Sequence, residues 1–451
     1  MKKNSTPKQL IKMIDEKITK KLEEFSIEEL SFSSGFIKRS KYKISGLAFI
    51  LGFFRMINNK VNTVESWAGQ ISRIIGIQIS VQSLQEKLQF RHIKLSEVLL
   101  KEVLSRQVFG KKNGISSSKL LTFFNRVFIE DSTCVTLPEK LVAFFPGTVN
   151  QKGPVGSTAR VQCRMELKSG ECEHVELQGY RDNDQKFAPQ ILGTLKKGDL
   201  VIRDMGYWVL SVFRLIIEKK AFFLSRFCYG TYIYDLQTKE QIDLYGKLRC
   251  LRRQGINVLD INVLLGKEEQ LPVRLVAIKA PQNVEQQRKR KMRKDKLDKR
   301  SKDYLEMMGW TIFVTNIPKK ILKPNEMLEV YGYRWRIEII FKCWKSRLRF
   351  ADMFKKKSMA PGRVYITFYL LLIWITLFFV KWYNFFLFQV FKQTGKILSL
   401  FKFATYVAEN FEKEYSSEQL MEEINYLARY CSQNKRTVKS SIEKIYVLNF
   451  T

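Results

Sequence analysis

Histidine is nearly absent from this chain, and its cysteines are not paired in motifs. Of 451 residues only His92 and His174 are histidines, and none of the seven cysteines stands in a C-x-x-C pair. Structural zinc sites need clustered cysteine or histidine ligands, and disulfide frameworks need cysteines at regular spacings. Both classes are therefore excluded, and the odd number of thiols is typical of a reducing cytosol.

Acidic residues are also scarce relative to basic ones. The chain has 44 Asp and Glu against 78 Lys and Arg, which gives a formal net charge of +34. This excess is larger than solubility requires, and it indicates a polyanionic partner, either a nucleic acid or an anionic membrane surface.

Long apolar runs are rare. The basic N-terminus has no apolar core, so we expect no signal peptide. One run, Val364–Val380, reaches the short limit for a membrane span and has basic flanks. Two interpretations are open, a membrane anchor and a helix buried beneath a sheet. The soluble composition of the rest of the chain favours the buried helix, and we expect no membrane partner.

Length and composition predict a folded protein of about three domains. We place a helical N-terminal DNA-binding region at 1–118, a catalytic domain at 119–382 and a helical C-terminal region at 383–451. Within the first, Ser66–Leu88 reads as helix, glycine turn, serine cap and second helix. This is the layout of a helix-turn-helix, although a generic helical hairpin gives the same pattern.

The middle of the chain predicts a mixed α/β order. Alternating residues predict a strand at Arg126–Asp131, an antiparallel hairpin over 161–177 and a strand at Gly198–Asp204, with a helix near 184–195 between the last two. A β-rich insertion follows over about 228–308, before a core strand at Trp310–Asn316. The insertion contains strands at 256–265 and 271–278. It ends in the basic run 286–302, which is either a solvated helix face or a phosphate-binding segment.

Tyr331–Lys345 reads YGYRWRIEIIFKCWK and predicts an amphipathic helix. At about 100° per residue, Tyr331, Arg334, Glu338 and Lys345 fall on one narrow face. An apolar stripe beside them suits burial against a sheet; its members are Ile337, Ile340, Phe341 and Trp344.

Three carboxylates occupy comparable positions: Asp131 on the first strand, Asp204 at the end of a later strand, and Glu338 on this helix. Glu130 precedes Asp131 but points to the opposite face of the strand. Three acidic groups without histidine or cysteine suit hard cations, Mg²⁺ or Mn²⁺. Two such ions about 3.5–4 Å apart would serve an in-line phosphoryl displacement.

The spacing Y-x2-R-x3-E-x6-K, together with Asp131 in IEDSTCVTLP and Asp204 in DMGYW, resembles the bacterial insertion-sequence transposases of the DDE class. The resemblance covers about 35–380. It implies a ribonuclease-H-like catalytic core with a β-rich insertion. It also implies two metal ions held by Asp131, Asp204 and Glu338, cleavage at the element ends, and transfer of the freed 3′-hydroxyls to target DNA.

The same resemblance assigns Tyr331, Arg334 and Lys345 to DNA contact and Trp310 to stacking on a flipped-out base. For Trp310 a core aromatic position is an equal alternative. The partners implied are double-stranded DNA, both terminal inverted repeats and target, and a second copy of the chain in a homodimer. We expect a cytoplasmic, nucleoid-associated protein. The alternative function is a domesticated or inactive relative that only binds DNA.

Overall fold

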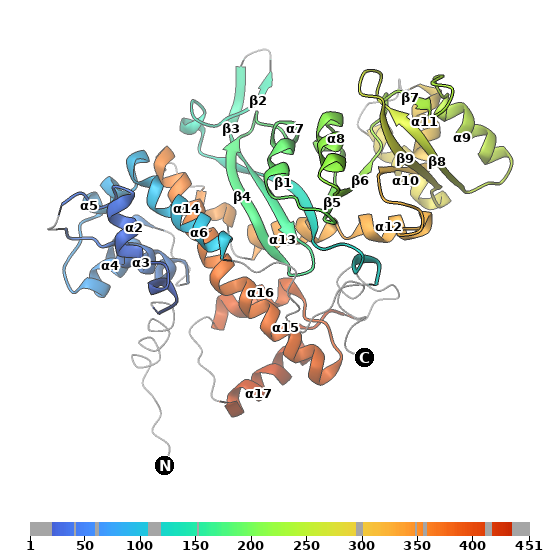
Figure 1. Ribbon diagram of the computed structural model, residues 1–451. Coiled ribbons are helices and arrows are strands. Elements are labelled where there is room, and N and C mark those ends of the chain that lie inside the picture. Colours follow the sequence, from blue (N-terminus) through green and yellow to red (C-terminus); the bar gives the residue numbers. More distant parts are fainter. Residues whose placement is uncertain are drawn as a thin grey trace.

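The computed structural model describes residues 20–39, 42–58, 63–106, 119–150, 153–294, 301–347, 350–354, 359–410 and 417–434. A ten-stranded mixed sheet runs through the middle of the molecule (Figure 1), in the order β2-β3-β1-β5-β6-β10-β9-β8-β7, with β4 paired to β3. The strands are β1 (Val127–Leu137), β2 (Pro146–Asn150), β3 (Gly153–Glu166), β4 (Glu171–Gly179), β5 (Leu200–Arg203), β6 (Phe222–Arg226), β7 (Ile233–Asp235), β8 (Val258–Leu265), β9 (Leu271–Lys279) and β10 (Trp310–Thr315).

The central five strands form the core, and the sequence predicted four of them, β1, β3, β4 and β5, but not β6. β1 pairs with β3 antiparallel and with β5 parallel, β5 pairs with β6 parallel, and β4 closes the edge beside β3. The order β4-β3-β1-β5-β6 is that of a ribonuclease-H-like fold. The predicted insertion strands are β8 and β9, and they continue the same sheet because β10 pairs with both β6 and β9.

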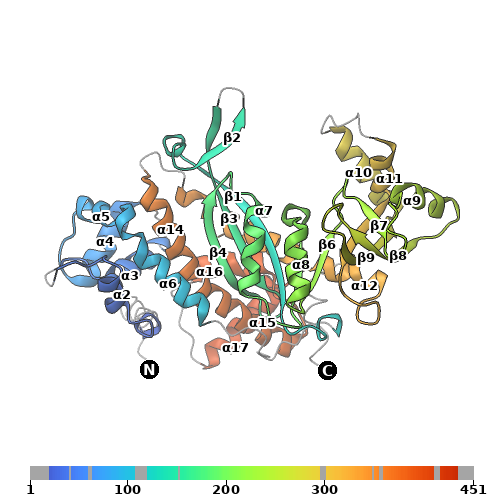
Figure 2. The same ribbon diagram turned by 45° about the horizontal axis from the view of Figure 1, so that its top comes forward.

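Helices cover both faces of the sheet and both of its ends (Figure 2). In Figure 2 α7 and α8 lie in front of the strands, and α15 and α16 lie behind them. The helices described are α2 (Ile27–Ser33), α3 (Gly46–Asn58), α4 (Val64–Ile75), α5 (Val81–Lys87), α6 (Ile93–Ser105), α7 (Asp184–Phe187), α8 (Leu210–Glu218), α9 (Leu244–Arg253), α10 (Gln282–Lys294), α11 (Lys302–Met308), α12 (Pro324–Gly332), α13 (Trp335–Ser346), α14 (Pro361–Trp374), α15 (Val380–Thr394), α16 (Leu400–Asn410) and α17 (Ser417–Tyr426).

The sheet separates two hydrophobic cores. Strand residues alternate between the faces, so Ile129 and Ile202 lie in one core with α13, whereas Phe128 and Val201 lie in the other with α8. The first core also contains side chains from the N-terminal helices, from α14 and from the C-terminal helices. The domain boundaries predicted from the sequence stay a prediction, and the N-terminal boundary at 118 lies outside the described residues.

The helical hairpin predicted at Ser66–Leu88 is present as α4 and α5. Thr63 caps α4 by accepting from the Ser66 amide, and Ser80 caps α5 by accepting from the Ser83 amide. Gly76 ends α4 with φ of 72°, a backbone conformation that glycine adopts without steric cost. The layout is confirmed, and its contact with DNA stays a prediction.

His92 packs between the N-terminal helices and lowers stability in acid. Its ring lies 5.5 Å from that of Phe36, and its Nδ1 is buried with no hydrogen-bond partner among the described residues. Burial, followed by the charges of Lys87, Arg91 and Lys38, lowers its pKa from 6.5 to about 4. The unfolded chain therefore binds more protons than the folded chain between these values, so stability falls as pH drops from about 6.5 to 4.

We expect His92→Gln to remove this part of the pH dependence. The contribution is at most about 3 kcal/mol, since each pKa unit corresponds to about 1.4 kcal/mol. Urea unfolding of both proteins at pH 7.5, 6.0 and 4.5 measures it, because the difference in unfolding free energy between them should shift in favour of the variant in acid. Parallel pH profiles for the two proteins would contradict the prediction.

The apolar run Val364–Val380 lies within one long helix, Pro361–Thr394, formed by α14, a π-helical turn and α15. Among the described residues this is the one helix long and apolar enough to cross a membrane, and 72% of its most apolar window is buried inside the molecule. Its start packs against the N-terminal helices, where a Cβ on Gly362 would lie 2.5 Å from the Phe90 nitrogen. Just past its middle, Lys381 pairs with Glu171 of β4, so the helix lies along the sheet as a core helix does.

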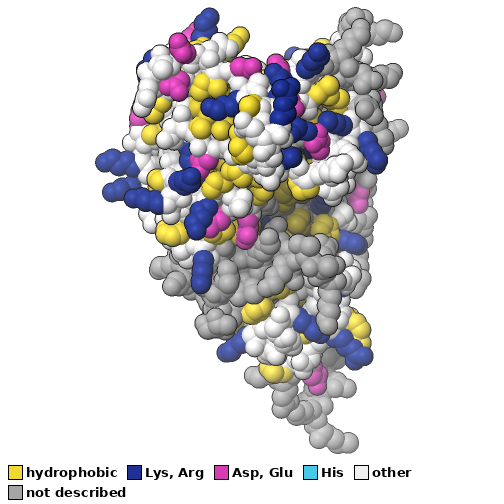
Figure 3. All heavy atoms as spheres, turned by 90° about the vertical axis from the view of Figure 1, so that its right-hand side faces the viewer, with side chains coloured by type: hydrophobic (Ala, Val, Ile, Leu, Met, Phe, Trp, Pro, Cys, Tyr) yellow, Lys and Arg dark blue, Asp and Glu magenta, His cyan; other side chains and the backbone are white. Residues whose placement is uncertain are grey.

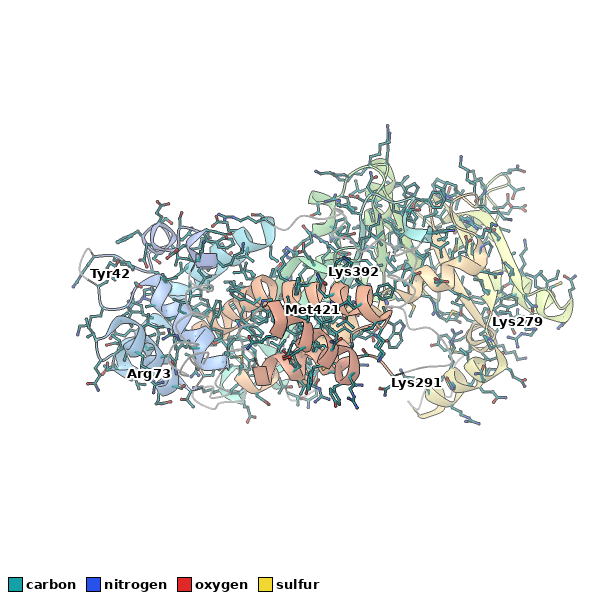
Figure 4. The ribbon with its side chains drawn as sticks, turned by 90° about the horizontal axis from the view of Figure 1, so that it is seen from below. Tyr42, Arg73, Lys279, Lys291, Lys392 and Met421 are labelled. Atoms are coloured by element: carbon teal, nitrogen blue, oxygen red, sulfur yellow. The ribbon has the colours of Figure 1, made fainter. Side chains whose placement is uncertain are left out.

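The view from below in Figure 4 shows the three regions along the molecule. Tyr42 and Arg73 mark the N-terminal helices, Lys392 and Met421 mark the C-terminal helices, and Lys279 and Lys291 mark the insertion. Several parts of the predicted regions fall outside the described residues, among them 1–19 and 107–118 of the N-terminal region, 295–300 of the basic run, and 411–416 and 435–451 of the C-terminal region.

Candidate active site

Two aspartates lie side by side just beyond the parallel pairing of β1 and β5. Asp131 lies in the middle of β1, and Asp204 directly follows β5. In the pairing of β1 with β5, Ile129 lies opposite Ile202. Two residues farther along each chain, the same register places Asp131 beside Asp204. Because side chains alternate, both carboxylates lie on the face of Ile129 and Ile202, toward α13. Adjacent strands are about 4.8 Å apart, which is close enough for two carboxylates to share a partner.

The helix predicted at Tyr331–Lys345 is divided into two helices. α12 ends at Gly332 and α13 begins at Trp335, so the expectation of one continuous helix was wrong. At the junction the amides of Arg334 and Ile337 bond to the carbonyls three residues before them, which is 3₁₀ rather than α geometry. The predicted apolar stripe of α13 is buried as expected, with Ile337, Ile340, Phe341 and Trp344 all in the core.

The Arg334 guanidinium joins the three predicted carboxylates. Its Nη1 donates to Asp131 Oδ2 at 2.9 Å, and its Nη2 donates to Glu338 Oε1 at 2.9 Å. Its Nε lies 3.9 Å from Asp204 Oδ1, which is an ion pair but too long for a hydrogen bond. Burial acts to lower the pKa of Arg334, and the surrounding phenol and carboxylates outweigh it and raise it. The structure thus brings together residues more than 200 positions apart in the chain.

Of the two other signature residues, Tyr331 lies at the edge of the same cluster, whereas Lys345 contacts β1 three residues beyond Asp131. The Tyr331 hydroxyl donates to Asp204 Oδ1 at 3.1 Å, and the Arg334 guanidinium stands 5.8 Å from its ring centroid. Burial, followed by the charge of Asp204, raises the pKa of Tyr331, so the phenol stays protonated. Lys345 Nζ donates to the Cys134 carbonyl of β1 at 2.7 Å, and burial lowers its pKa.

The pKa of Asp131 is shifted by its surroundings. Burial raises its pKa to about 6, against the opposing effects of Arg334 and of the Ser132 amide. The charges of Asp204 and Glu338 raise it further. A carboxylate in this environment gains from any additional positive charge that binds beside it.

Glu130 has a separate role on the opposite face of β1. It is fully buried and accepts from Arg164 Nε at 3.0 Å and from Arg203 Nε at 2.7 Å. Arg164 also donates to Glu173 at 2.8 Å. This network faces the core beneath α8, away from Arg334, so Glu130 supports the sheet while Asp131 belongs to the carboxylate cluster.

Sequence reasoning missed Arg226, the last residue of β6. Its pKa is lowered by burial and raised by the nearby Tyr331 and Asp204, which shows that it lies beside the cluster. Its Nε is buried and has no hydrogen-bond partner among the described residues. An arginine between the apolar residues Leu224 and Phe227 of a buried strand was the available signal.

The structure does not leave Trp310 on the surface. Its side chain is 1% exposed in the core that contains α8, and its indole N–H donates to Glu306 Oε1 at 2.9 Å. Nearby, the Arg288 guanidinium of α10 donates to the Trp310 carbonyl at 2.9 Å, so part of the basic run packs against β10. The core alternative describes this conformation, and base stacking by Trp310 stays a prediction.

The three carboxylates of the cluster suit a divalent metal, and in this structure the Arg334 guanidinium lies between them. Three carboxylates from three separate elements approach one point, and hard oxygen ligands are what Mg²⁺ and Mn²⁺ prefer. Among the residues that the structure describes, no group of three acidic, histidine or cysteine side chains is placed to hold a metal ion. The residues therefore fit the metal by chemistry, provided that the guanidinium moves.

Comparisons with known proteins agree on one family. The model of a family described as "Transposase DDE domain" matches residues 122–374. The transposase of insertion sequence element IS231B from Bacillus thuringiensis subsp. berliner is 26% identical over 74% of this chain and 73% of its own length. The IS231F transposase from B. thuringiensis subsp. israelensis is 28% identical over 71% of this chain and 70% of its own.

A third relative, the IS1151 transposase of Clostridium perfringens, is 25% identical over 77% of this chain and 76% of its own length. Among solved structures, the piggyBac transposase synaptic complex with hairpin DNA aligns with 91% of this chain and 82% of its own, at a TM-score of 0.42 and 9% identity. That last likeness is too distant to support an argument about the site.

Proposed function

This chain belongs to the family of transposases with a DDE domain, and from that premise we propose that it cleaves DNA at the ends of its insertion sequence. It then joins the freed 3′-hydroxyl ends to target DNA. The observation that carries the proposal is the convergence of Asp131, Asp204 and Glu338 around the Arg334 guanidinium, just beyond the parallel pairing of β1 and β5.

Asp131, Asp204 and Glu338 are the residues that would hold the divalent ions. DDE transposases generally use divalent metals, and two bound ions supply an activated water or 3′-hydroxyl and stabilisation of the leaving oxygen. The register of β1 and β5 fixes the positions of Asp131 and Asp204 along the two strands, so the sheet sets the distance between them. Glu338 comes from the first turn of α13, whose buried stripe anchors that helix to β1.

The signature cations and the phenol are proposed to hold the DNA strand. Arg334 presents a planar fork that matches a phosphate, and Lys345 at the far end of α13 adds a second cation toward the same side. Tyr331 donates its hydroxyl proton to Asp204 and so keeps that carboxylate oriented; a DNA phosphate would accept the same proton in place of Asp204. Trp310 would stack on a base only after leaving its present core position.

The wider DNA surface is proposed to span all three regions of the chain. The face in Figure 3, over the insertion, is dotted with Lys and Arg side chains, with fewer acidic groups between them. At the other end of the molecule the α4–α5 hairpin carries Arg73 (Figure 4). A net charge of +34 makes such binding strong and salt-dependent. The protein would act in the cytoplasm on nucleoid DNA, as a homodimer that holds two element ends.

The test is a cleavage assay with DNA that carries the short inverted repeats bracketing the coding sequence. With Mg²⁺ the chain should nick the repeat ends to leave 3′-hydroxyls and then join them to a second duplex, and EDTA should stop both steps. A duplex with scrambled ends is the control. Binding of the repeats without cleavage in either Mg²⁺ or Mn²⁺ would contradict the proposal and identify a relative that only binds DNA.

A further inference from the structure

The carboxylate cluster is closed by the chain's own cation. The Arg334 side chain is 10% exposed and lies among Asp131, Glu338 and Asp204, at 2.9, 2.9 and 3.9 Å. A guanidinium in this position fills the space into which all three carboxylates point. This explains why residues with the right chemistry for a divalent ion are not placed to hold one.

This contact leaves one donor of the Arg334 guanidinium unsatisfied. Two of the guanidinium nitrogens donate to carboxylates, whereas Nε is buried with no hydrogen-bond partner among the described residues. An unpaired buried donor is unfavourable. One guanidinium also leaves a negative excess on three carboxylates, and the half-buried Arg226 interacts electrostatically with one of them, Asp204.

The backbone at Arg334 can accommodate a change of side-chain position. Arg334 is the residue that joins α12 to α13, and the amides of this junction make 3₁₀ rather than α-helical bonds. Such 3₁₀ turns are common at helix ends and as connectors, and within a helix they often mark a hinge. A phosphate offers this guanidinium a bidentate, charge-assisted partner that satisfies more of its donors than the present arrangement does.

We propose that Arg334 is a positioning residue that stands in for the metal in the DNA-free chain and leaves the carboxylates when a DNA phosphate draws it away. This inference rests on the proposed function and adds the order in which DNA and the divalent cation bind. Binding of DNA and of divalent cation is then one coupled event, and a chain without DNA keeps its active site closed.

Coupling of this kind is reciprocal. If DNA raises the affinity for the cation by some factor, the cation raises the affinity for DNA by the same factor. Coupling between two sites typically amounts to about 5–150-fold. A residue that only binds phosphate would produce no such link, and removing it would leave cation binding to the free chain unchanged.

The test measures Mn²⁺ binding to the full chain by isothermal titration calorimetry at pH 7.5, without DNA. Arg334→Gln should bind Mn²⁺ at least about tenfold more tightly than the wild type, within the usual range of coupling. Lys342→Gln is the matched control. It removes one cation from the exposed side of the same helix, so it should change the affinity by less than about twofold. Glu338→Gln removes one of the three proposed ligands, so the Mn²⁺ binding that remains in this variant measures binding outside the cluster.

A second measurement needs no Arg334 variant and covers the case in which Arg334→Gln is unstable. The wild type is titrated with Mn²⁺ in the presence of a duplex without element ends, which supplies phosphates but is not a cleavage substrate. Its cation affinity should rise about 5–150-fold, and Mn²⁺ should tighten duplex binding by the same factor. Glu338→Gln should show neither effect.

The outcomes separate the inference from the proposed function. Equal Mn²⁺ affinity of wild type and Arg334→Gln, or of wild type with and without the duplex, overturns the role of Arg334 while cleavage in Mg²⁺ still supports the transposase. If neither protein binds Mn²⁺ at the cluster in any state, and no cleavage occurs, the proposed function itself fails.

Discussion

Replacing Asp131 by Asn is expected to abolish metal-dependent cleavage and to spare DNA binding. The substitution removes a negative charge but keeps an oxygen that can accept from Arg334 Nη1, so the helix junction should stay in place. We expect the same loss for Asp204→Asn and Glu338→Gln. Each should lower the cleavage rate by at least about three orders of magnitude, as loss of a central electrostatic group in an active site does.

Cleavage of end-labelled repeat DNA and a gel-shift titration of the same DNA measure the two quantities separately. Asp182→Asn is the matched control because it makes the same change on an exposed turn, where the carboxylate pairs only with Lys186 among the described residues. A cleavage rate near that of the wild type in any of the three cluster variants would remove that residue from the assignment.

Replacing Glu130 by Gln is expected to destabilise the folded protein but not to abolish DNA cleavage. Glu130 is the carboxylate between two buried arginines, and both would remain in the core without their shared counter-ion. Removing one partner of a buried ion pair costs about 3–5 kcal/mol. Arg164 keeps Glu173, so most of the cost falls on Arg203, whose pKa is lowered by its burial.

Urea unfolding measures this loss, with Asp131→Asn as the control from the adjacent position. The control should lose less than about 1 kcal/mol of unfolding free energy. Burial already disfavours the charged form of Asp131 and raises its pKa, so replacing it by a neutral amide removes little stabilisation. Adding Arg203→Met to Glu130→Gln should recover part of the stability, since an apolar side chain does not need the missing charge. An unfolding midpoint unchanged in Glu130→Gln would show that the network does not support the sheet.

The two variants together separate neighbouring carboxylates by function. Asp131→Asn should fold and not cleave, whereas Glu130→Gln should cleave as long as it remains folded at low temperature. The alternation of β1 is the reason: one residue faces α13 and the other faces α8.

Much of the fold could be predicted because its signals are local. The alternation at 126–131, the hairpin over 161–177 and the insertion strands became β1, the β3–β4 pair, β8 and β9. The amphipathic stripe of α13 and the caps of the α4–α5 hairpin were also readable, since each depends on residues within a turn or two of one another. The helix junction before Trp335 was not, because the residues there are compatible with an unbroken helix.

The sequence by itself predicted the family, which the family model confirms, and it supports the proposed chemistry of the site. The order of Asp131, Asp204 and the Tyr331–Lys345 signature predicts oxygen ligands on a sheet and a helix, and the charge of +34 indicates a polyanionic partner. Tertiary structure alone decided what each charged group faces. It set Glu130 among buried arginines, enclosed Trp310 in a core and brought Arg334 into the carboxylate cluster. The contact of Arg203 with Glu130 joins residues 73 positions apart, and that of Arg334 with Asp131 joins residues 203 apart. Such contacts depend on strand register and helix packing, which no local pattern encodes.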